Sequence, residues 1–100
     1  MSIRITRGSG NVFADMGFAP DKAASLLIRT DLTIAITERI KESGLTQKQT
    51  ARLFGVTQPR VSDIVRGRVD RFSIDALVEM LTRLGVEVRL ELRKRRVRSA

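Results

Sequence analysis

The chain has 100 residues, of which 42% are hydrophobic, and these values indicate one globular domain with a modest core. It has no cysteine and no histidine, which excludes disulfides and thiolate metal sites and removes the commonest general base, so we expect neither an enzyme nor a bound metal or cofactor. The net charge of +8 favours a polyanionic partner such as DNA, and the lack of a long apolar run predicts a cytoplasmic protein without a signal peptide or a membrane span.

Residues 1–19 are predicted to form an N-terminal arm. Ile3 and Ile5 alternate with polar residues in a stretch typical of a brief strand or of a disordered start. Residues 7–11 are loop-like, and residues 12–19 are irregular or a short turn whose apolar side chains must be buried.

A long helix is predicted from Pro20 to about Ser43, where Gly44 ends it. One apolar stripe runs along it at helical spacing, formed by Ile28, Leu32, Ala35, Ile36 and Ile40. A second stripe is formed by Ala23, Leu27 and Ile34. A helix that is apolar on two faces is buried on two sides. The second face meets another subunit or partner, or residues 12–18 fold back and cover it, and the sequence leaves both interpretations open.

Residues 46–67 predict two short helices joined by a tight turn. Thr46 is expected to cap the first helix, Gly55 to reverse the chain after it, and Thr57 to cap the second helix. The seam between the helices is expected to be filled by Phe54, Val56, Val61, Ile64 and Val65. An ordinary helical hairpin is the alternative, but the joint spacing favours a helix-turn-helix whose second helix reads the DNA major groove.

The positive charge is concentrated on this motif and on the C-terminal end of the chain. Residues 41–71 carry seven basic and three acidic side chains, and residues 86–100 carry six and two. Because neutralising phosphates releases condensed counterions, double-stranded DNA is the expected partner, which also predicts a nucleoid-associated protein. An acidic membrane surface would need a helix with one basic and one bulky apolar face, and the basic end is predicted as strand and tail instead.

A last helix is predicted from Ile74 to Leu84, with Ser73 as its cap and Gly85 at its end. Residues 86–93 then alternate strictly between apolar and charged side chains, which predicts a half-buried strand. Its apolar positions are Val86, Val88, Leu90 and Leu92. A lone strand needs a ladder partner, which residues 3–6 could supply, as could the same strand of a second subunit across a two-fold axis. Residues 94–100 are predicted to be a flexible basic tail.

The second helix of the motif carries the candidate base-reading residues, because its N-terminal part points into the groove. They are Gln58, Arg60, Ser62 and Asp63. Gln58 suits adenine, and Arg60 suits guanine or a phosphate. Asp63 either accepts from cytosine N4 or pairs with Arg60 or Arg66 inside the protein. The candidate phosphate contacts are Thr46, Gln47, Lys48, Thr57, Arg66, Arg68 and Arg71.

The motif resembles the Cro/C1-type (XRE) helix-turn-helix family. The matching residues are Gln47, Ala51, Gly55, Val56, Gln58, Val61, Ser62 and Gly67. The flanks resemble HigA-type antitoxins, namely residues 9–18 before the long helix, residues 72–75, and Leu84-Gly85 before a final strand. The resemblance implies a mainly α fold, a five-helix-type Cro/C1 domain over residues 20–85, with a C-terminal strand at 86–93 that pairs across a dimer.

The same resemblance implies a homodimeric repressor that binds an inverted-repeat operator of its own operon. It also implies the antitoxin of a type II toxin–antitoxin system, which neutralises a RelE/HigB-like mRNA interferase. The implied toxin-contact residues are Val12, Phe13, Ala23, Leu27 and Ile34. The alternative is a stand-alone XRE transcriptional regulator with no toxin, and a pure protein-interaction module comes third. No small-molecule ligand is expected.

Overall fold

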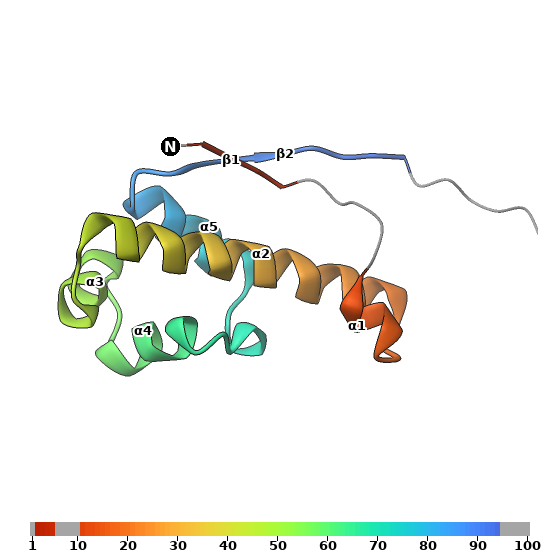
Figure 1. Cartoon of the computed structure of the whole chain (residues 1–100), viewed down its shortest axis with the longest axis horizontal. Helices are drawn as coiled ribbons and strands as arrows, with labels where there is room; N and C mark the ends of the chain where they lie inside the picture. The colour runs from red at the N-terminus through yellow and green to blue at the C-terminus, as the bar shows by residue number, and fades with distance from the viewer. Residues whose placement is uncertain (1, 6–10, 95–100) are drawn as a thin grey trace, which may run out of the picture.

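The structure, a computed structural model, describes residues 2–5 and 11–94 and is mainly helical in these ranges. In chain order the elements are β1 (Ser2–Ile5), α1 (Val12–Asp15), α2 (Pro20–Ser43), α3 (Gln47–Phe54), α4 (Gln58–Val65), the 3-10 helix η1 (Val69–Arg71), α5 (Ile74–Arg83) and β2 (Glu87–Leu90). The long helix α2 runs between the two strands and the pair α3–α4 (Figure 1). The prediction of a mainly helical fold with a short C-terminal strand is confirmed, and the described ranges hold five α-helices, of which α1 lies in the predicted N-terminal arm. No helix in these two ranges is long and apolar enough to cross a membrane.

The predicted boundaries of α2 and α3 are confirmed by their caps. Gly44 follows α2 with a φ of 72°, in the left-handed region that glycine adopts without strain. At the start of α3 the Gln49 N–H donates to the Thr46 hydroxyl at 3.1 Å, and the Thr46 N–H donates to the Gln49 side-chain oxygen at 2.9 Å. This reciprocal capping box satisfies two backbone donors at once.

The predicted cap at the start of α4 is wrong. Thr57 occupies the cap position with extended backbone, but its side chain makes no capping hydrogen bond. A capping oxygen serves the second or third helical N–H. The second residue of α4 is Pro59, which has no N–H, and the third N–H, that of Arg60, donates to the Thr57 carbonyl at 3.1 Å. The Thr57 hydroxyl therefore caps nothing and remains at the open end of α4.

The hydrophobic core lies between α2 and α5, and α3 and α4 pack against it. Its most completely buried side chains, Leu32, Ile36, Val61, Ile64, Leu77 and Leu81, come from α2, α4 and α5. The first predicted stripe of α2 is confirmed, because four of its five members are buried and Ile28 packs partly buried against them. The expectation that Val65 fills the helix seam is wrong, since it is 43% exposed.

The second stripe of α2 is covered only near its beginning. Helix α1 packs against α2, where Ala23 is buried, whereas Ile34 further along remains 51% exposed. The side chain of Asn11 caps α1 by accepting the Phe13 N–H at 2.9 Å, and the ring of Phe13 meets that of Phe18 edge to face. Residues 12–18 thus fold back onto α2, which was one of the two expectations for its second apolar stripe. They leave part of that stripe exposed.

The strands β1 and β2 form a two-stranded parallel sheet, with Ser2 opposite Glu87 and Ile5 opposite Leu90. The predicted strand at residues 86–93 is shorter than expected, and its ladder partner lies in the same chain. Only its beginning is half-buried. Val86 is buried and Val88 partly so, but Leu90 and Leu92 are 71% and 91% exposed. Most of the predicted loop at 7–11 and of the tail at 94–100 lies outside the described residues.

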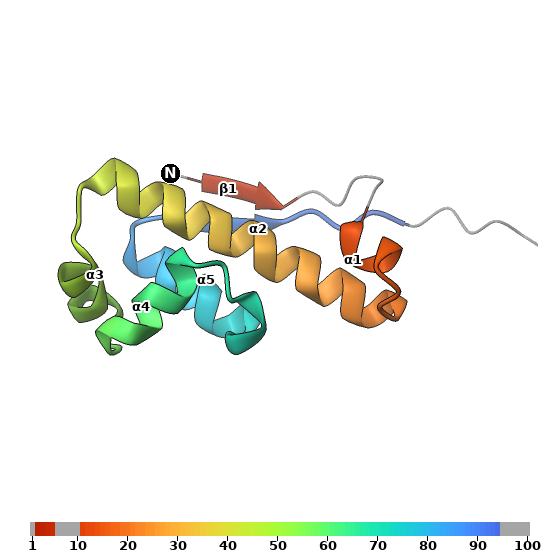
Figure 2. The same ribbon diagram turned by 60° about the horizontal axis from the view of Figure 1, so that its bottom comes forward.

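The sheet and α4 lie on opposite sides of the molecule, as the turned view also shows (Figure 2). Strand β2 contacts α5, while β1 contacts α2, so the second edge of β2 lies on the α5 side. Among the strands that the structure describes, none pairs with this second edge.

The two threonines at the cap positions of α3 and α4 give a stability prediction. Thr46→Ala removes the capping box of α3, so we expect the free energy of unfolding to fall by about 1 kcal/mol. Thr57→Ala removes no capping bond and should cost a few tenths at most. Urea denaturation followed by circular dichroism measures both. Equal losses in the two variants would contradict this assignment of caps.

Candidate nucleic-acid interface

The turn between α3 and α4 is held by a glycine and by an arginine from α5. Gly55 ends α3 with a φ of 69°, a conformation that L side chains rarely adopt. The Arg83 guanidinium donates to the Leu53 carbonyl at 3.2 Å, which satisfies a terminal acceptor of α3 and ties it to α5. The direction in which α4 leaves the turn is therefore set by local chain geometry and by a contact from a third helix.

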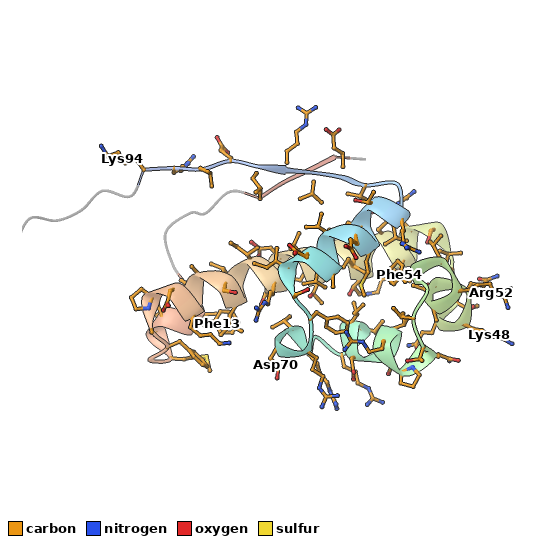
Figure 3. All side chains as sticks on the ribbon, turned by 180° about the vertical axis from the view of Figure 1, so that it is seen from behind. Phe13, Lys48, Arg52, Phe54, Asp70 and Lys94 are labelled. Carbon is orange, nitrogen blue, oxygen red and sulfur yellow. The ribbon has the colours of Figure 1, made fainter. Side chains whose placement is uncertain are left out.

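The inner face of α4 is apolar, and the outer face is polar. Val61 and Ile64 are 0% and 1% exposed in the core. The outer face borders an open depression at the beginning of α3 and α4, lined by Gln47, Gln58, Pro59, Ser62, Asp63 and Arg66. Figure 3 shows side chains of this helix at the edge of the molecule opposite the strands. Three of the four predicted base-reading residues and two of the predicted phosphate contacts thus come together on one surface.

Arg60 is the predicted base reader that the structure places elsewhere. Its guanidinium carbon lies 4.1 Å from the centre of the Phe72 ring, which is the geometry of a cation–π contact. The same guanidinium donates to the Arg71 carbonyl at 3.2 Å. Arg60 therefore links α4 to η1 and to the segment after it, and it would have to leave both partners to reach a base.

Asp63 is paired inside the protein, but with other partners than expected. Arg71 approaches its carboxylate at 3.3 Å and Arg68 at 3.7 Å. The prediction that Arg60 or Arg66 would be the partner is wrong, because Arg60 stacks on Phe72 instead, and η1 brings Arg68 and Arg71 to the side of α4 that carries Asp63. The predicted phosphate contacts Arg68 and Arg71 are thus engaged with a carboxylate.

Among the remaining candidates, Lys48 and Arg66 are exposed and have no ion pair in the described part of the chain. Gln47 lines the depression beside Gln58, and the Thr46 hydroxyl is occupied by the capping box. Arg52 was not foreseen as a contact. It is exposed one turn after Lys48 and projects with it from the same end of the molecule (Figure 3). The signal that could have revealed it is the four-residue spacing of the two cations on α3.

This surface offers amide, hydroxyl and guanidinium groups suited to hydrogen bonds with base edges and phosphates. Within residues 2–5 and 11–94, no group of three or more acidic side chains is placed to hold a metal ion.

A family model described as a helix-turn-helix domain matches residues 12–93 of the chain. A solved structure described as an XRE family transcriptional regulator has a TM-score of 0.70 and 30% sequence identity, over 81% of this chain and 91% of that chain. The chain belongs to the XRE family of helix-turn-helix proteins. This membership confirms the broader of the two resemblances. The fold and the family of this XRE protein are those of a DNA-binding transcriptional regulator. No curated protein matches the chain significantly.

Proposed function

We propose that this XRE protein is a sequence-specific repressor that reads double-stranded DNA with the outer face of α4. The observation that carries the proposal is the joint position of Gln58, Ser62 and Asp63 beside Gln47 and Arg66 on one open surface. A glutamine can make paired hydrogen bonds to adenine, and serine or aspartate can take up neighbouring donors on base edges. Arg66 and Gln47 flank them and suit phosphates, which fix the register of the helix in the groove.

We further propose that Lys48, Thr57, Arg68 and Arg71 contribute phosphate contacts, together with Thr46. Lys48 is exposed in the first turn of α3, and Thr57 has an uncommitted hydroxyl at the beginning of α4. The first turn of a helix has N–H groups without an intrahelical acceptor, and the dipole of the helix favours anions there. Arg68 and Arg71 would exchange Asp63 for phosphate, and Arg60 would exchange Phe72 for a base. The exchange at Arg68 and Arg71 costs little free energy, because exposed ion pairs are weak.

A homodimer on an inverted repeat is the proposed active form. Its support is the second edge of β2, which lies on the α5 side without a strand partner in the described residues. Antiparallel pairing of two such edges across a two-fold axis would give a four-stranded sheet, with the exposed Leu90 at the end of each paired strand. Two α4 helices related in this way read half-sites about one helical turn apart.

The antitoxin role is proposed on the resemblance in the N-terminal segment and on the surface it forms. Val12 is 56% exposed on α1, and Ile34 remains exposed on the partly covered second face of α2. Phe13 and Leu27 are half-buried and can contribute to the same contact, whereas Ala23 is already buried beneath α1. An exposed apolar surface of this kind suits a protein partner such as a RelE/HigB-like toxin.

The neighbouring reading frame tests the antitoxin role. We expect it to encode a basic protein of about domain size that arrests growth when expressed alone and that co-purifies with this chain. Val12→Asp combined with Ile34→Asp should abolish co-purification and leave DNA binding unchanged. A harmless neighbour that fails to co-purify would favour the rival function, a stand-alone XRE regulator with the same DNA chemistry.

Gln58 and Lys48 test the assignment of base and phosphate contacts. Gln58→Ala should weaken binding to the preferred site by about 1–3 kcal/mol and relax base preference at one position. Lys48→Ala should weaken binding to all duplexes alike and lower the salt slope by about one unit. Fluorescence anisotropy over a panel of mutated duplexes at several salt concentrations measures both. Uniform losses across the panel for Gln58→Ala would remove it from the base-reading set.

Leu90 tests the dimer. Leu90→Glu places a charge on the exposed end of β2, so we expect the sedimentation coefficient to drop to that of a monomer. Met16→Glu is the matched control, because Met16 is similarly exposed, at 67% against 71% for Leu90, but directly follows α1 and lies outside the strands. A Leu90→Glu variant that stays dimeric, or a wild-type chain that sediments as a monomer at all concentrations, would rule out this interface.

A further inference from the structure

One acidic side chain lies among the residues that line the depression of the candidate DNA-binding surface, and it is Asp63. A carboxylate facing a polyanion is repelled unless it is paired or hydrogen-bonded. Its presence on α4 therefore calls for a physical role.

We propose that Asp63 is a specificity-determining residue that keeps Arg68 and Arg71 from phosphates until α4 meets a base pair with a suitable hydrogen-bond donor. This inference rests on the proposed function, because it requires that α4 reads DNA.

The geometry places Asp63 at the border between base-facing and phosphate-facing residues. Asp63 lines the depression together with Ser62, and its carboxylate is paired at the same time with Arg71 at 3.3 Å and Arg68 at 3.7 Å. The side chain of Asp63 is 16% exposed, whereas those of Arg68 and Arg71 are 42% and 50% exposed. The carboxylate is thus held in place, while the two guanidinium groups reach into solvent.

The backbone that carries Arg71 is anchored independently of this ion pair. The Arg60 guanidinium stacks on the Phe72 ring and donates a hydrogen bond to the Arg71 carbonyl at 3.2 Å. Neither contact involves Asp63. The Arg71 side chain can therefore turn from Asp63 toward a phosphate without displacing η1. Exchanging Asp63 for a phosphate therefore requires only side-chain movement.

Two binding states follow from the energetics of this exchange. Exposed ion pairs are weak, so a phosphate can take either arginine from Asp63. Once both arginines leave, the carboxylate faces DNA with no counter-charge and costs free energy unless a base donates to it. Cytosine N4 and adenine N6 carry such donors in the major groove. On other sequences Asp63 retains the arginines, and fewer phosphates are neutralised.

The decisive test compares Asp63→Asn with Asp70→Asn on a duplex of mixed sequence. Both changes remove one negative charge, and Asp70 lies in η1 with no ion pair in the described part of the chain. We expect Asp63→Asn to steepen the log–log salt slope by about 0.9 for each arginine released, up to about 1.8. The DNA affinity of Asp63→Asn should also be about two- to fivefold higher than that of Asp70→Asn. This factor corresponds to the free energy of one exposed ion pair. Asp70→Asn should leave the slope unchanged.

Two further measurements keep the test conclusive. In an Arg68→Gln/Arg71→Gln background, Asp63→Asn should no longer change the slope, because no arginine remains to be released. On a duplex selected by the wild type from a random pool, Asp63→Asn should lower the ratio of specific to non-specific affinity. Thermal melting of each variant, followed by circular dichroism, verifies that it is folded.

Equal slopes for Asp63→Asn and Asp70→Asn would overturn the inference, as would weaker binding of Asp63→Asn to mixed-sequence DNA. In either case salt-dependent binding of the wild type would leave the proposed function standing. If the wild type shows no salt-dependent DNA binding at all, the proposed function itself fails.

Discussion

The burial of Val61 and Ile64 in the core is the interaction on which the rest of this structure depends. Helix α4 has eight residues, and helices of this length are not stable alone in water. These two side chains, 0% and 1% exposed, join α4 to the core that α2 and α5 build around Leu32 and Leu77. Because they face inward, the opposite side of the helix, which carries Ser62, faces outward, and Gln58 is exposed in the first turn. The same contact that makes α4 a helix therefore also presents Gln58 and Ser62 to solvent.

Charge is distributed on this framework in two ways. Some cations, such as Lys48 and Arg66, are exposed and have no ion pair in the part of the chain that the structure describes. Others serve the fold, as Arg83 does when it bonds the end of α3, or are engaged near α4, as Arg68 and Arg71 are with Asp63. A net charge of +8 therefore overstates the number of positive groups that are free to meet phosphates. Arg68 and Arg71 are the groups that can exchange their ion-pair partner when α4 contacts DNA.

Local sequence signals were sufficient for most of the helices, since caps and glycine stops act within one turn. Thr46, Gly44 and Ser73 mark boundaries that the structure confirms. Thr57 does not act as a cap, because Pro59 has no N–H and the Arg60 N–H donates to the Thr57 carbonyl instead. The residues of the DNA-facing surface could be proposed from the spacing of the motif, and whether they contact DNA stays a prediction.

Features that depend on contacts between distant segments could not be predicted. The sequence showed that residues 86–93 need a strand partner, but only the folded chain shows β1 beside β2 in parallel register. Likewise, the stacking of Arg60 on Phe72 and the pairing of Asp63 with Arg71 depend on where η1 packs. Spacing along α4 alone favours nearer partners on the same helix.

Mapping the DNA contact on the whole chain tests the central claim most directly, namely that the outer face of α4 is the DNA-reading surface. Isotope-labelled protein would be titrated with a duplex selected from a random pool, and backbone amide shifts would be followed by nuclear magnetic resonance. We predict that the largest shifts fall on residues 57–66 and at the beginning of α3. Shifts concentrated on α1 or on β2, with α4 unchanged, would contradict it.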